Sequence, residues 1–273
     1  MLNKDGELED IQSQPDKRQV AINKVGVRNI KYPIKVLDKA YQAQHTVADI
    51  SVYVELPANF RGTHMSRLIE VLHRYQREIK VEKIDEILTD IRQTLNSETA
   101  YLELNFPYFI EKQAPVSKAK SLMEYSCAII ASQKKDGKKD LVLRVKVPIT
   151  SLCPCSKAIS ERGAHNQRAL VTVSIRMRTF IWIEDLINLI EEGAVCDLYA
   201  LLKREDEKYI TERAYDNPAL VEDIVREIAV RIKQDSRITW FTVESESMES
   251  IHNHNAYAYV EGNVSLRGEN DGN

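Results

Sequence analysis

The chain has 273 residues, of which 43% are hydrophobic and 29% charged, a composition ordinary for a globular protein with one large core or two modest ones. Its formal net charge of -3 argues against nucleic acid as the default partner, because phosphate binding relies on a concentrated excess of Lys and Arg. No run approaches the roughly 20 apolar residues needed to cross a bilayer, and the N-terminus lacks the apolar region of a signal peptide. We therefore expect a cytoplasmic protein that binds neither nucleic acid nor membrane.

The four cysteines indicate reactive or buried thiols. In a long intracellular chain, such residues are better interpreted as core thiols, metal ligands or catalytic groups than as a disulfide framework. They are Cys127, Cys153, Cys155 and Cys196.

The first half of the chain predicts two strands, two helices and two further strands. Residues 1–20 are polar and lack periodicity, which indicates a flexible tail. Alternating apolar residues from Ile50 to Leu56 predict a half-buried strand, and helical spacing from Met65 to Ile79 and from Ile84 to Leu95 predicts two amphipathic helices. The expected strands lie near residues 26–37, 46–57, 99–111 and 120–133.

The second half repeats this order. Asn217-Pro218 supplies a cap residue and a proline for the start of the last predicted helix. Runs of strands and runs of helices favour an α+β fold with antiparallel sheets and helices on one face. The expected strands lie near residues 141–149, 169–178, 238–247 and 255–262, with helices at 183–192 and 218–234. We therefore predict a first unit at 21–136, a second unit at 137–265 and a tail at 266–273.

Two insertions distinguish the second half from the first. Residues 150–167 lie between its first two strands, and residues 194–216 lie between its helices. Extra loops on a repeated scaffold are where function tends to lie.

The first insertion combines thiols with an imidazole. Cys153 and Cys155 flank a proline, and His165 follows in the same loop. The Cys-x-Cys pair alone is equally compatible with a structural or incidental pair of thiols. A thiolate and an imidazole together can bind a borderline-soft ion such as zinc. The loop lacks four ligands for a closed structural zinc site, so an open catalytic metal site fits better.

The second insertion is a candidate source of a third, carboxylate ligand. Its run Lys203-Arg204-Glu205-Asp206-Glu207-Lys208 holds three consecutive acidic residues, which chemistry alone does not rank. A solvated face is the alternative interpretation of this run.

Three further residues in the C-terminal half of the chain suit a catalytic cleft. His252 and His254 are two residues apart, so both can project from one face of an extended segment and transfer protons near neutral pH. A polar, hydrogen-bonded turn is the alternative. Glu222 lies in the first turn of a predicted helix, where the helix dipole alone favours a carboxylate. It also lies at the margin of the apolar stripe, from where it could accept two adjacent N–H groups of a guanine-like ring.

A glycine turn in the first half precedes a helix start rich in basic residues. Arg61, His64 and Arg67 lie there, and helix starts bind anions such as phosphate. Capping of the helix by Thr63 is the alternative explanation for the composition. The chain has no Gly-x-x-x-x-Gly-Lys loop and no dinucleotide fingerprint, which argues against an ordinary nucleotide-binding domain.

Several of these motifs together resemble the type IB GTP cyclohydrolases, over nearly the whole chain outside the tails. The matching stretches are Ser151-Leu152-Cys153-Pro154-Cys155-Ser156-Lys157, Gly163-Ala164-His165-Asn166-Gln167-Arg168, Phe60-Arg61-Gly62-Thr63-His64-Met65-Ser66, Asp206-Glu207 with Thr211-Glu212, and Glu249-Ser250-Ile251-His252-Asn253-His254-Asn255.

The resemblance implies a tunnelling fold with two tandem units, each a four-stranded antiparallel sheet with two helices on one face. It implies a homo-oligomer, usually a tetramer, with active sites at subunit interfaces. The implied reaction converts GTP and water to 7,8-dihydroneopterin triphosphate and formate, the first step toward folate. It uses one divalent ion per site, for which zinc, manganese and iron all suit the mixed ligands.

The resemblance also implies roles for individual residues. Cys153, His165 and Glu207 match the metal-binding positions, and Cys153 and His252 match the catalytic ones. Glu222 matches the guanine anchor, whereas Arg61, His64 and Arg67 are expected to bind the triphosphate. The role of Cys155 stays open.

Two other functions remain alternatives. A nitrile reductase of the same fold would use Cys153 as a nucleophile, but it leaves the matching His165, Glu207 and His252 unexplained. A pterin- or purine-binding protein with a structural metal would contain metal but release no formate.

Overall fold

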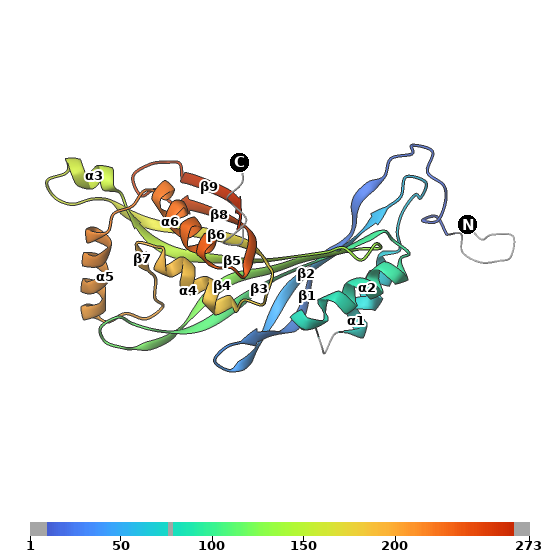
Figure 1. Cartoon of the computed structure of the whole chain (residues 1–273), viewed down its shortest axis with the longest axis horizontal. Helices are drawn as coiled ribbons and strands as arrows, with labels where there is room; N and C mark the ends of the chain where they lie inside the picture. The colour runs from blue at the N-terminus through green and yellow to red at the C-terminus, as the bar shows by residue number, and fades with distance from the viewer. Residues whose placement is uncertain (1–9, 76–78, 265–273) are drawn as a thin grey trace, which may run out of the picture. The chain divides into compact units, whose positions relative to one another are not determined.

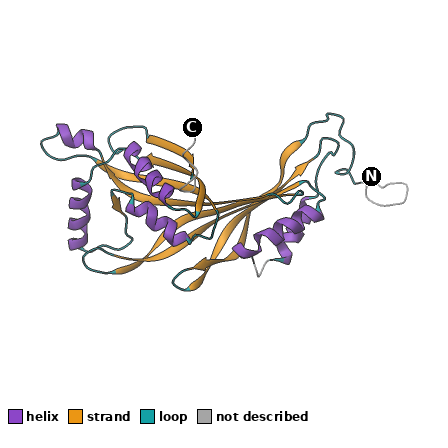
Figure 2. Ribbon diagram, viewed as in Figure 1, coloured by secondary structure: helices purple, strands orange, loops and turns teal. Residues whose placement is uncertain are grey.

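The computed structural model describes residues 10–75 and 79–264, and within them it has an α+β fold with antiparallel strands and six α-helices (Figures 1 and 2). None of the helices in these ranges is long and apolar enough to cross a membrane. The strands are β1 (Ile22–Asp38), β2 (Gln42–Leu56), β3 (Thr99–Gln113), β4 (Lys120–Lys134), β5 (Lys139–Leu152), β6 (Asn166–Met177), β7 (Cys196–Asp197), β8 (Ile238–Ser247) and β9 (Ala256–Asn263). The helices are α1 (Met65–Arg74), α2 (Ile84–Thr94), α3 (Pro154–Ile159), α4 (Ile183–Glu192), α5 (Arg204–Asp216) and α6 (Val221–Gln234).

The chain divides into two compact units. The first comprises residues 1–37, 43–106 and 129–141, and the second comprises 38–42, 107–128 and 142–273. The boundaries between the units fall inside β3, β4 and β5, so each of these strands contributes residues to both units. The sequence instead predicted one boundary between residues 136 and 137, and that division of the repeat stays a prediction.

The two predicted tails lie partly outside the described residues, which exclude 1–9 and 265–273. Of the N-terminal segment, residues 10–20 are described. There the backbone oxygens of Gln12 and Gln14 accept hydrogen bonds from the N–H groups of Gly62 and Arg61, both at 3.0 Å. This part of the predicted tail is therefore attached to the loop after β2.

The first unit buries one side of its sheet under α1 and α2. Strand β2 pairs with β3 in antiparallel register, with Val52 opposite Leu102. The predicted alternation is confirmed, because Ile50, Val52, Val54 and Leu56 are all buried. Both helices bury their apolar stripes, which is typical of amphipathic helices that cover a sheet.

The second unit places β6 in the interior of its sheet. Strand β6 pairs with β5 on one side and with β8 on the other, and β8 pairs in turn with β9, all antiparallel. Helix α6 packs on β8 and β9 and contacts α4. The predicted strand and helix types are therefore confirmed in this unit as well.

The predicted start of the last helix is wrong. Helix α6 begins at Val221, with Leu220 as its N-cap, whereas Asn217 ends the preceding helix α5. The second insertion is thus largely helical rather than a loop. In the first unit, the N-cap of α1 is His64 and has no side-chain cap bond, so capping by Thr63 is also wrong.

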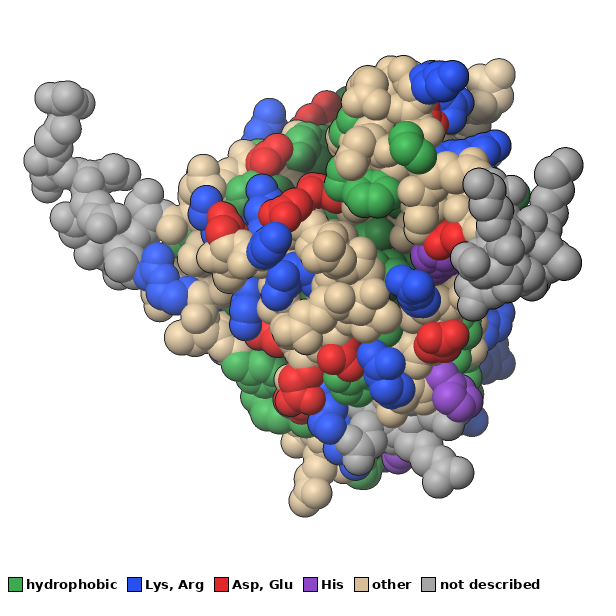
Figure 3. All heavy atoms as spheres, turned by 90° about the vertical axis from the view of Figure 1, so that its right-hand side faces the viewer, with side chains coloured by type: hydrophobic (Ala, Val, Ile, Leu, Met, Phe, Trp, Pro, Cys, Tyr) green, Lys and Arg blue, Asp and Glu red, His purple; other side chains and the backbone are tan. Residues whose placement is uncertain are grey.

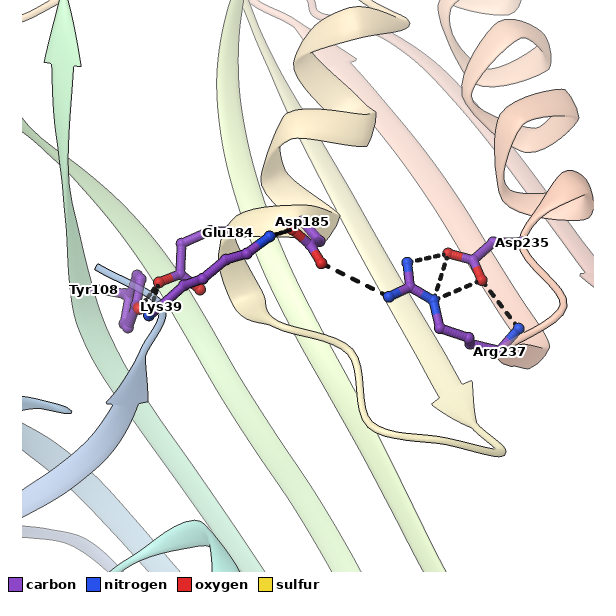
Figure 4. A network of polar contacts seen from close by, with 6 residues as sticks. All are labelled: Lys39, Tyr108, Glu184, Asp185, Asp235 and Arg237. Carbon is purple, nitrogen blue, oxygen red and sulfur yellow. Dashed lines mark hydrogen bonds and ion pairs between the residues drawn. The ribbon is translucent and has the colours of Figure 1, made fainter. Parts of the chain in front are cut away.

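Charged side chains of both signs are interspersed over the face drawn in Figure 3. A network of hydrogen bonds and ion pairs attaches the start of α4 to neighbouring segments of the second unit, as Figure 4 shows. Glu184 accepts hydrogen bonds from the Tyr108 hydroxyl and the Lys39 backbone N–H, both at 2.7 Å. The next residue, Asp185, pairs with the Lys39 ammonium at 2.5 Å and lies 3.7 Å from the Arg237 guanidinium. These bonds fix α4 against β3 and the turn after β1.

A second cluster of charges is buried between β3, α4 and β7. The Lys112 ammonium lies 2.7 Å from Glu191 and 3.2 Å from Asp197, and the Tyr125 hydroxyl donates to Glu191 at 2.7 Å. The Lys112 and Glu191 side chains are only 13% and 9% exposed. Because β7 pairs with Ile149 and Thr150 of β5, this cluster braces the strand that leads into Cys153.

Candidate active site

The pairing of β5 with β6 brings Cys153 and His165 together. The last pair of the two strands is Leu152 opposite Asn166, so Cys153 and His165 are the next residues on each side. The Cys153 N–H donates to the His165 carbonyl oxygen at 3.2 Å. The Ser156 hydroxyl donates to the Cys153 carbonyl oxygen at 3.1 Å and accepts from the His165 N–H at 3.3 Å. The loop between the strands is therefore closed at its base, with a thiol and an imidazole on neighbouring residues.

The Cys153 thiol is placed to ionise. Its sulfur is the N-cap of α3 and accepts the Ser156 N–H at 3.4 Å. Desolvation alone would raise the pKa of this thiol, but the N–H groups of Ser156 and Cys155 and the nearby His165 lower it overall. The thiolate is the form of cysteine that binds metals. Cys155, by contrast, is exposed on the first turn of α3.

The His165 ring is oriented by two side chains that sequence reasoning did not select. Its Nδ1 lies 2.8 Å from Oε1 of Gln167, whose Nε2 donates to Glu249 at 3.1 Å. Because a carboxylate only accepts hydrogen bonds, the Gln167 amide nitrogen faces Glu249 and its oxygen faces His165. His165 Nδ1 must then carry the proton, which leaves the Nε2 lone pair available as a metal ligand.

The loop after β8 brings the paired histidines to the same place. The ring of His252 lies edge-on to His165 with 6.4 Å between centroids, and it stacks on His254 at 5.1 Å. Both rings are exposed. His252 thus lies beside His165, and it lines one cavity with Cys153, as expected for a histidine close to the metal. Its catalytic role stays a prediction.

A cavity of about 330 Å³ joins these residues to α6. Cys153, Glu222, Glu249, His252 and His254 all line it, so the predicted guanine anchor and the predicted catalytic residues share one space. Ser247, another lining residue, is fully buried, and its hydroxyl has no hydrogen-bond partner among the described residues. The cavity therefore offers carboxylate and imidazole groups to a bound molecule.

The donors at the Cys153 loop fit a divalent ion, but Glu207 does not complete the set in this chain. Within residues 10–75 and 79–264, no three His, Cys, Asp or Glu side chains are arranged to hold a metal. Glu207 lies exposed in the first turn of α5, whereas the preceding Asp206 is fully buried. A thiolate and an imidazole are the softer ligands of zinc, manganese or ferrous iron, and a carboxylate would have to join them.

The predicted triphosphate residues lie in the first unit, and none lines the cavity. Arg61 and Arg67 are exposed, and Arg61 donates to the Gln14 side chain at 2.9 Å. His64 lies 3.2 Å from Asp10. Their role in substrate binding stays a prediction.

The sequence holds a signal for the two missed residues. Gln167 follows His165 by two positions at the start of β6, where residues two apart share a face. Glu249 lies three residues before His252 in the loop after β8. Neither residue type is distinctive by itself, so only the pairing of β6 with β5 and with β8 makes their role evident.

The chain is similar in fold to uricases of known structure. A uricase from Bacillus fastidious matches with a TM-score of 0.54 over 89% of this chain and 93% of that one, at 6% identity. Urate oxidase from Bacillus subtilis 168 matches with a TM-score of 0.53 over 88% and 98%, at 8% identity. At these identities the likeness concerns the fold alone.

Sequence relatives are far more similar. The GTP cyclohydrolase FolE2 of Syntrophotalea carbinolica is 57% identical over 254 residues, which cover 93% of this chain and 95% of that protein. The protein of the same name from Nitrosococcus oceani is 54% identical, with the same coverage. The model of the family "Type I GTP cyclohydrolase folE2" matches residues 8–258. The chain therefore belongs to the Type I GTP cyclohydrolase folE2 family.

Proposed function

We propose that the protein is a metal-dependent GTP cyclohydrolase that converts GTP and water to 7,8-dihydroneopterin triphosphate and formate, at the start of folate synthesis. Its relatives carry the name GTP cyclohydrolase at more than half identity over 93% of the chain. The observation that carries the proposal is the cavity, because Cys153, Glu222 and His252 line it together and His165 lies beside Cys153.

One divalent ion per site would be held by Cys153, His165 and Glu207. When bound there, such an ion supplies a water acidic enough to ionise near neutral pH. The lowered thiol pKa of Cys153 and the fixed Nδ1 proton of His165 both favour ligation. Three protein ligands would leave the open position that hydrolysis needs.

The other lining residues suit the organic part of the reaction. Glu222 would accept the adjacent N1–H and N2–H donors of guanine, a pair that adenine lacks. His252 would move protons to and from the reacting ring, because an imidazole titrates near neutral pH. Glu222 and His252 line the same cavity from α6 and from the loop after β8, so one bound base can meet both.

The finer fold and the assembly belong to the same proposal. Two tandem tunnelling-fold units would comprise β1–β4 with α1 and α2, and β5, β6, β8 and β9 with α4 and α6, in agreement with the strand order. The active form would be a cytoplasmic homotetramer with interface sites, which would bring a carboxylate to each pair of Cys153 and His165. Arg61, His64 and Arg67 would then bind the triphosphate.

Incubation with GTP and added manganese tests the proposed activity. We expect formate and a second product in equal amounts, and this product should show neopterin fluorescence after oxidation. A folded, metal-loaded sample that yields neither would overturn the proposal and favour a pterin- or purine-binding protein. NADPH-dependent, metal-free reduction of a pterin-like nitrile would instead favour the nitrile reductase.

A further inference from the structure

Asp206 is the one fully buried residue of the acidic run in the first turn of α5, and all of its acceptor capacity is used. One carboxylate oxygen accepts the N–H groups of Val116 and Ser117, at 2.8 and 2.9 Å. The other accepts the Ser117 hydroxyl at 2.6 Å and the Lys203 N–H at 2.8 Å. Four donors thus converge on one side chain that is 0% exposed.

These donors come from two places in the second unit. Lys203 precedes α5, so its bond caps the helix to which Asp206 belongs. Val116 and Ser117 lie in the turn that joins β3 to β4. The turn presents consecutive N–H groups to the carboxylate, and its Ala119 N–H donates to the Ser117 hydroxyl at 3.2 Å. Asp206 therefore ties the start of α5 to this turn.

Little else holds the start of α5. Of its thirteen residues, only Asp206 and Ala214 are buried. Ala214 packs with Val195 and Cys196 in a small apolar cluster that Ile210 joins from the same helix. These apolar contacts hold the C-terminal half of α5, so the position of its first turn depends on the carboxylate.

The carboxylate is held in its charged form. All four polar groups bonded to this side chain are N–H or O–H donors, so they match an ionised carboxylate, which only accepts hydrogen bonds. Four bonds to a charged acceptor are stronger than the same bonds to a neutral one.

We propose that Asp206 is a positioning residue of the metal site, which fixes the direction of Glu207 by locking the first turn of α5 to the β3–β4 turn. Successive residues of an α-helix point about 100° apart, so a fixed inward Asp206 sets where the next side chain points. The inference rests on the proposed function, because it takes Glu207 as the carboxylate ligand. It assigns Asp206, the buried member of the acidic run, to positioning and Glu207, one of its two exposed members, to the ion.

The test measures zinc affinity of the folded, assembled protein by competition with a chromophoric chelator. Asp206→Asn replaces one acceptor oxygen by an NH₂ group that faces N–H donors, so we expect zinc affinity to fall about tenfold or more. Ser117→Ala removes one of the four bonds and should give a smaller loss in the same direction. Glu205→Gln, at an exposed neighbouring position, is the matched control and should bind zinc like the wild type.

Hydrogen exchange in the metal-free protein supplies a second measurement. Amides of residues 204–208 should exchange faster in Asp206→Asn, whereas amides of α6 should keep their protection. If Asp206→Asn does not fold, Ser117→Ala alone decides the matter by the same two measurements.

Glu207→Gln separates this inference from the proposed function. Weaker zinc binding in Glu207→Gln, with wild-type binding in Asp206→Asn and Ser117→Ala, would overturn the positioning role and leave the ligand set intact. Wild-type binding in Glu207→Gln would overturn the ligand set, and the positioning role with it. Loss of zinc affinity in all three variants supports both.

Discussion

Cys153 and Cys155 are two residues apart but have different surroundings, which predicts opposite results for the same substitution. Cys153 is half-buried, has a lowered pKa and lines the cavity, whereas Cys155 is exposed. Cys153→Ala should abolish bound zinc and reduce formate release by at least about a hundredfold, because it removes a proposed ligand. Cys155→Ala should retain activity within about threefold.

Formate release and zinc content of the two purified variants check this prediction. Their circular dichroism spectra should match the wild type, since both positions tolerate a small side chain. An inactive Cys155→Ala beside an active Cys153→Ala would reverse the assignment of the ligand.

Gln167 predicts an effect that acts through the neighbouring imidazole. Its amide holds the proton on Nδ1 of His165 and is itself held by Glu249. Gln167→Ala should weaken zinc binding about tenfold to a hundredfold, the usual effect of losing a partner that orients a ligand. Asn166→Ala, at the exposed neighbouring position, is the control and should bind zinc normally. Equal zinc affinities of the two variants would show that Gln167 does not orient the ligand.

At the scale of elements, the buried charges between β3, α4 and β7 make a strong prediction about stability. Burial raises the pKa of Glu191 although Lys112 opposes this. Lys112→Met would leave Glu191 and Asp197 without their cation, so we expect a loss of about 3 kcal/mol in the free energy of unfolding. Lys120→Met is the matched control, because its pair with Glu111 is exposed, and it should change stability by about 0.5 kcal/mol or less.

Urea unfolding of both variants measures these differences. A Lys112→Met variant as stable as Lys120→Met would contradict the idea that the buried cluster braces β7 against β5.

The helix α5 predicts a dependence of stability on pH. The pKa of Asp206 lies below its unfolded value of 3.8, so between the two values the unfolded chain binds more protons. The contribution of Asp206 is fully present above pH 3.8 and is lost as the pH falls toward the folded pKa. Unfolding by urea between pH 5 and pH 3 should therefore show a steeper loss of stability in the wild type than in Asp206→Asn. Parallel curves would contradict this.

The sequence predicted the elements that bury apolar stripes and missed those that do not. Strand β2 alternates between apolar and polar residues, and helix α2 has apolar residues at helical spacing, so their sequence periodicity identifies both. Helix α5 buries only Asp206 and Ala214, which leaves no stripe to detect. Asn217-Pro218 then looked like a helix start, although Asn217 ends α5 and α6 begins at Val221.

Reasoning from the residues alone placed Cys153 beside His165 because one loop carries both, whereas the roles of Glu222 and His252 came from the family resemblance. Cys153 and His165 flank the last pair of β5 and β6, so their closeness in sequence becomes closeness in space. Gln167 and Glu249 needed the strand register, which the pattern of residues does not specify. The family resemblance selected Glu207 rather than Asp206, and the structure adds that Asp206 is buried whereas Glu207 is exposed.

At the scale of the whole molecule, fold and function separate. The uricases share the fold at 6% and 8% identity, whereas proteins named GTP cyclohydrolase FolE2 are 54% to 57% identical over most of the chain. A fold that persists at such low identity does not specify a reaction. We therefore expect the chemistry to lie in the loops after β5 and β8 and in the first turns of α5 and α6.

The incomplete ligand set predicts that two inactive variants restore each other. Within the described ranges, Glu207 does not form a three-ligand group with Cys153 and His165, so we expect it to act in the site of a second copy. Cys153→Ala and Glu207→Gln should each be inactive alone. When equal amounts are unfolded and reassembled together, about a quarter of the sites should combine an intact Cys153 from one subunit with an intact Glu207 from another, if subunits mix at random. Formate release by the mixture, compared with the wild type reassembled in the same way, measures this fraction. If both ligands came from one subunit, every site would still carry one substitution and the mixture would stay inactive.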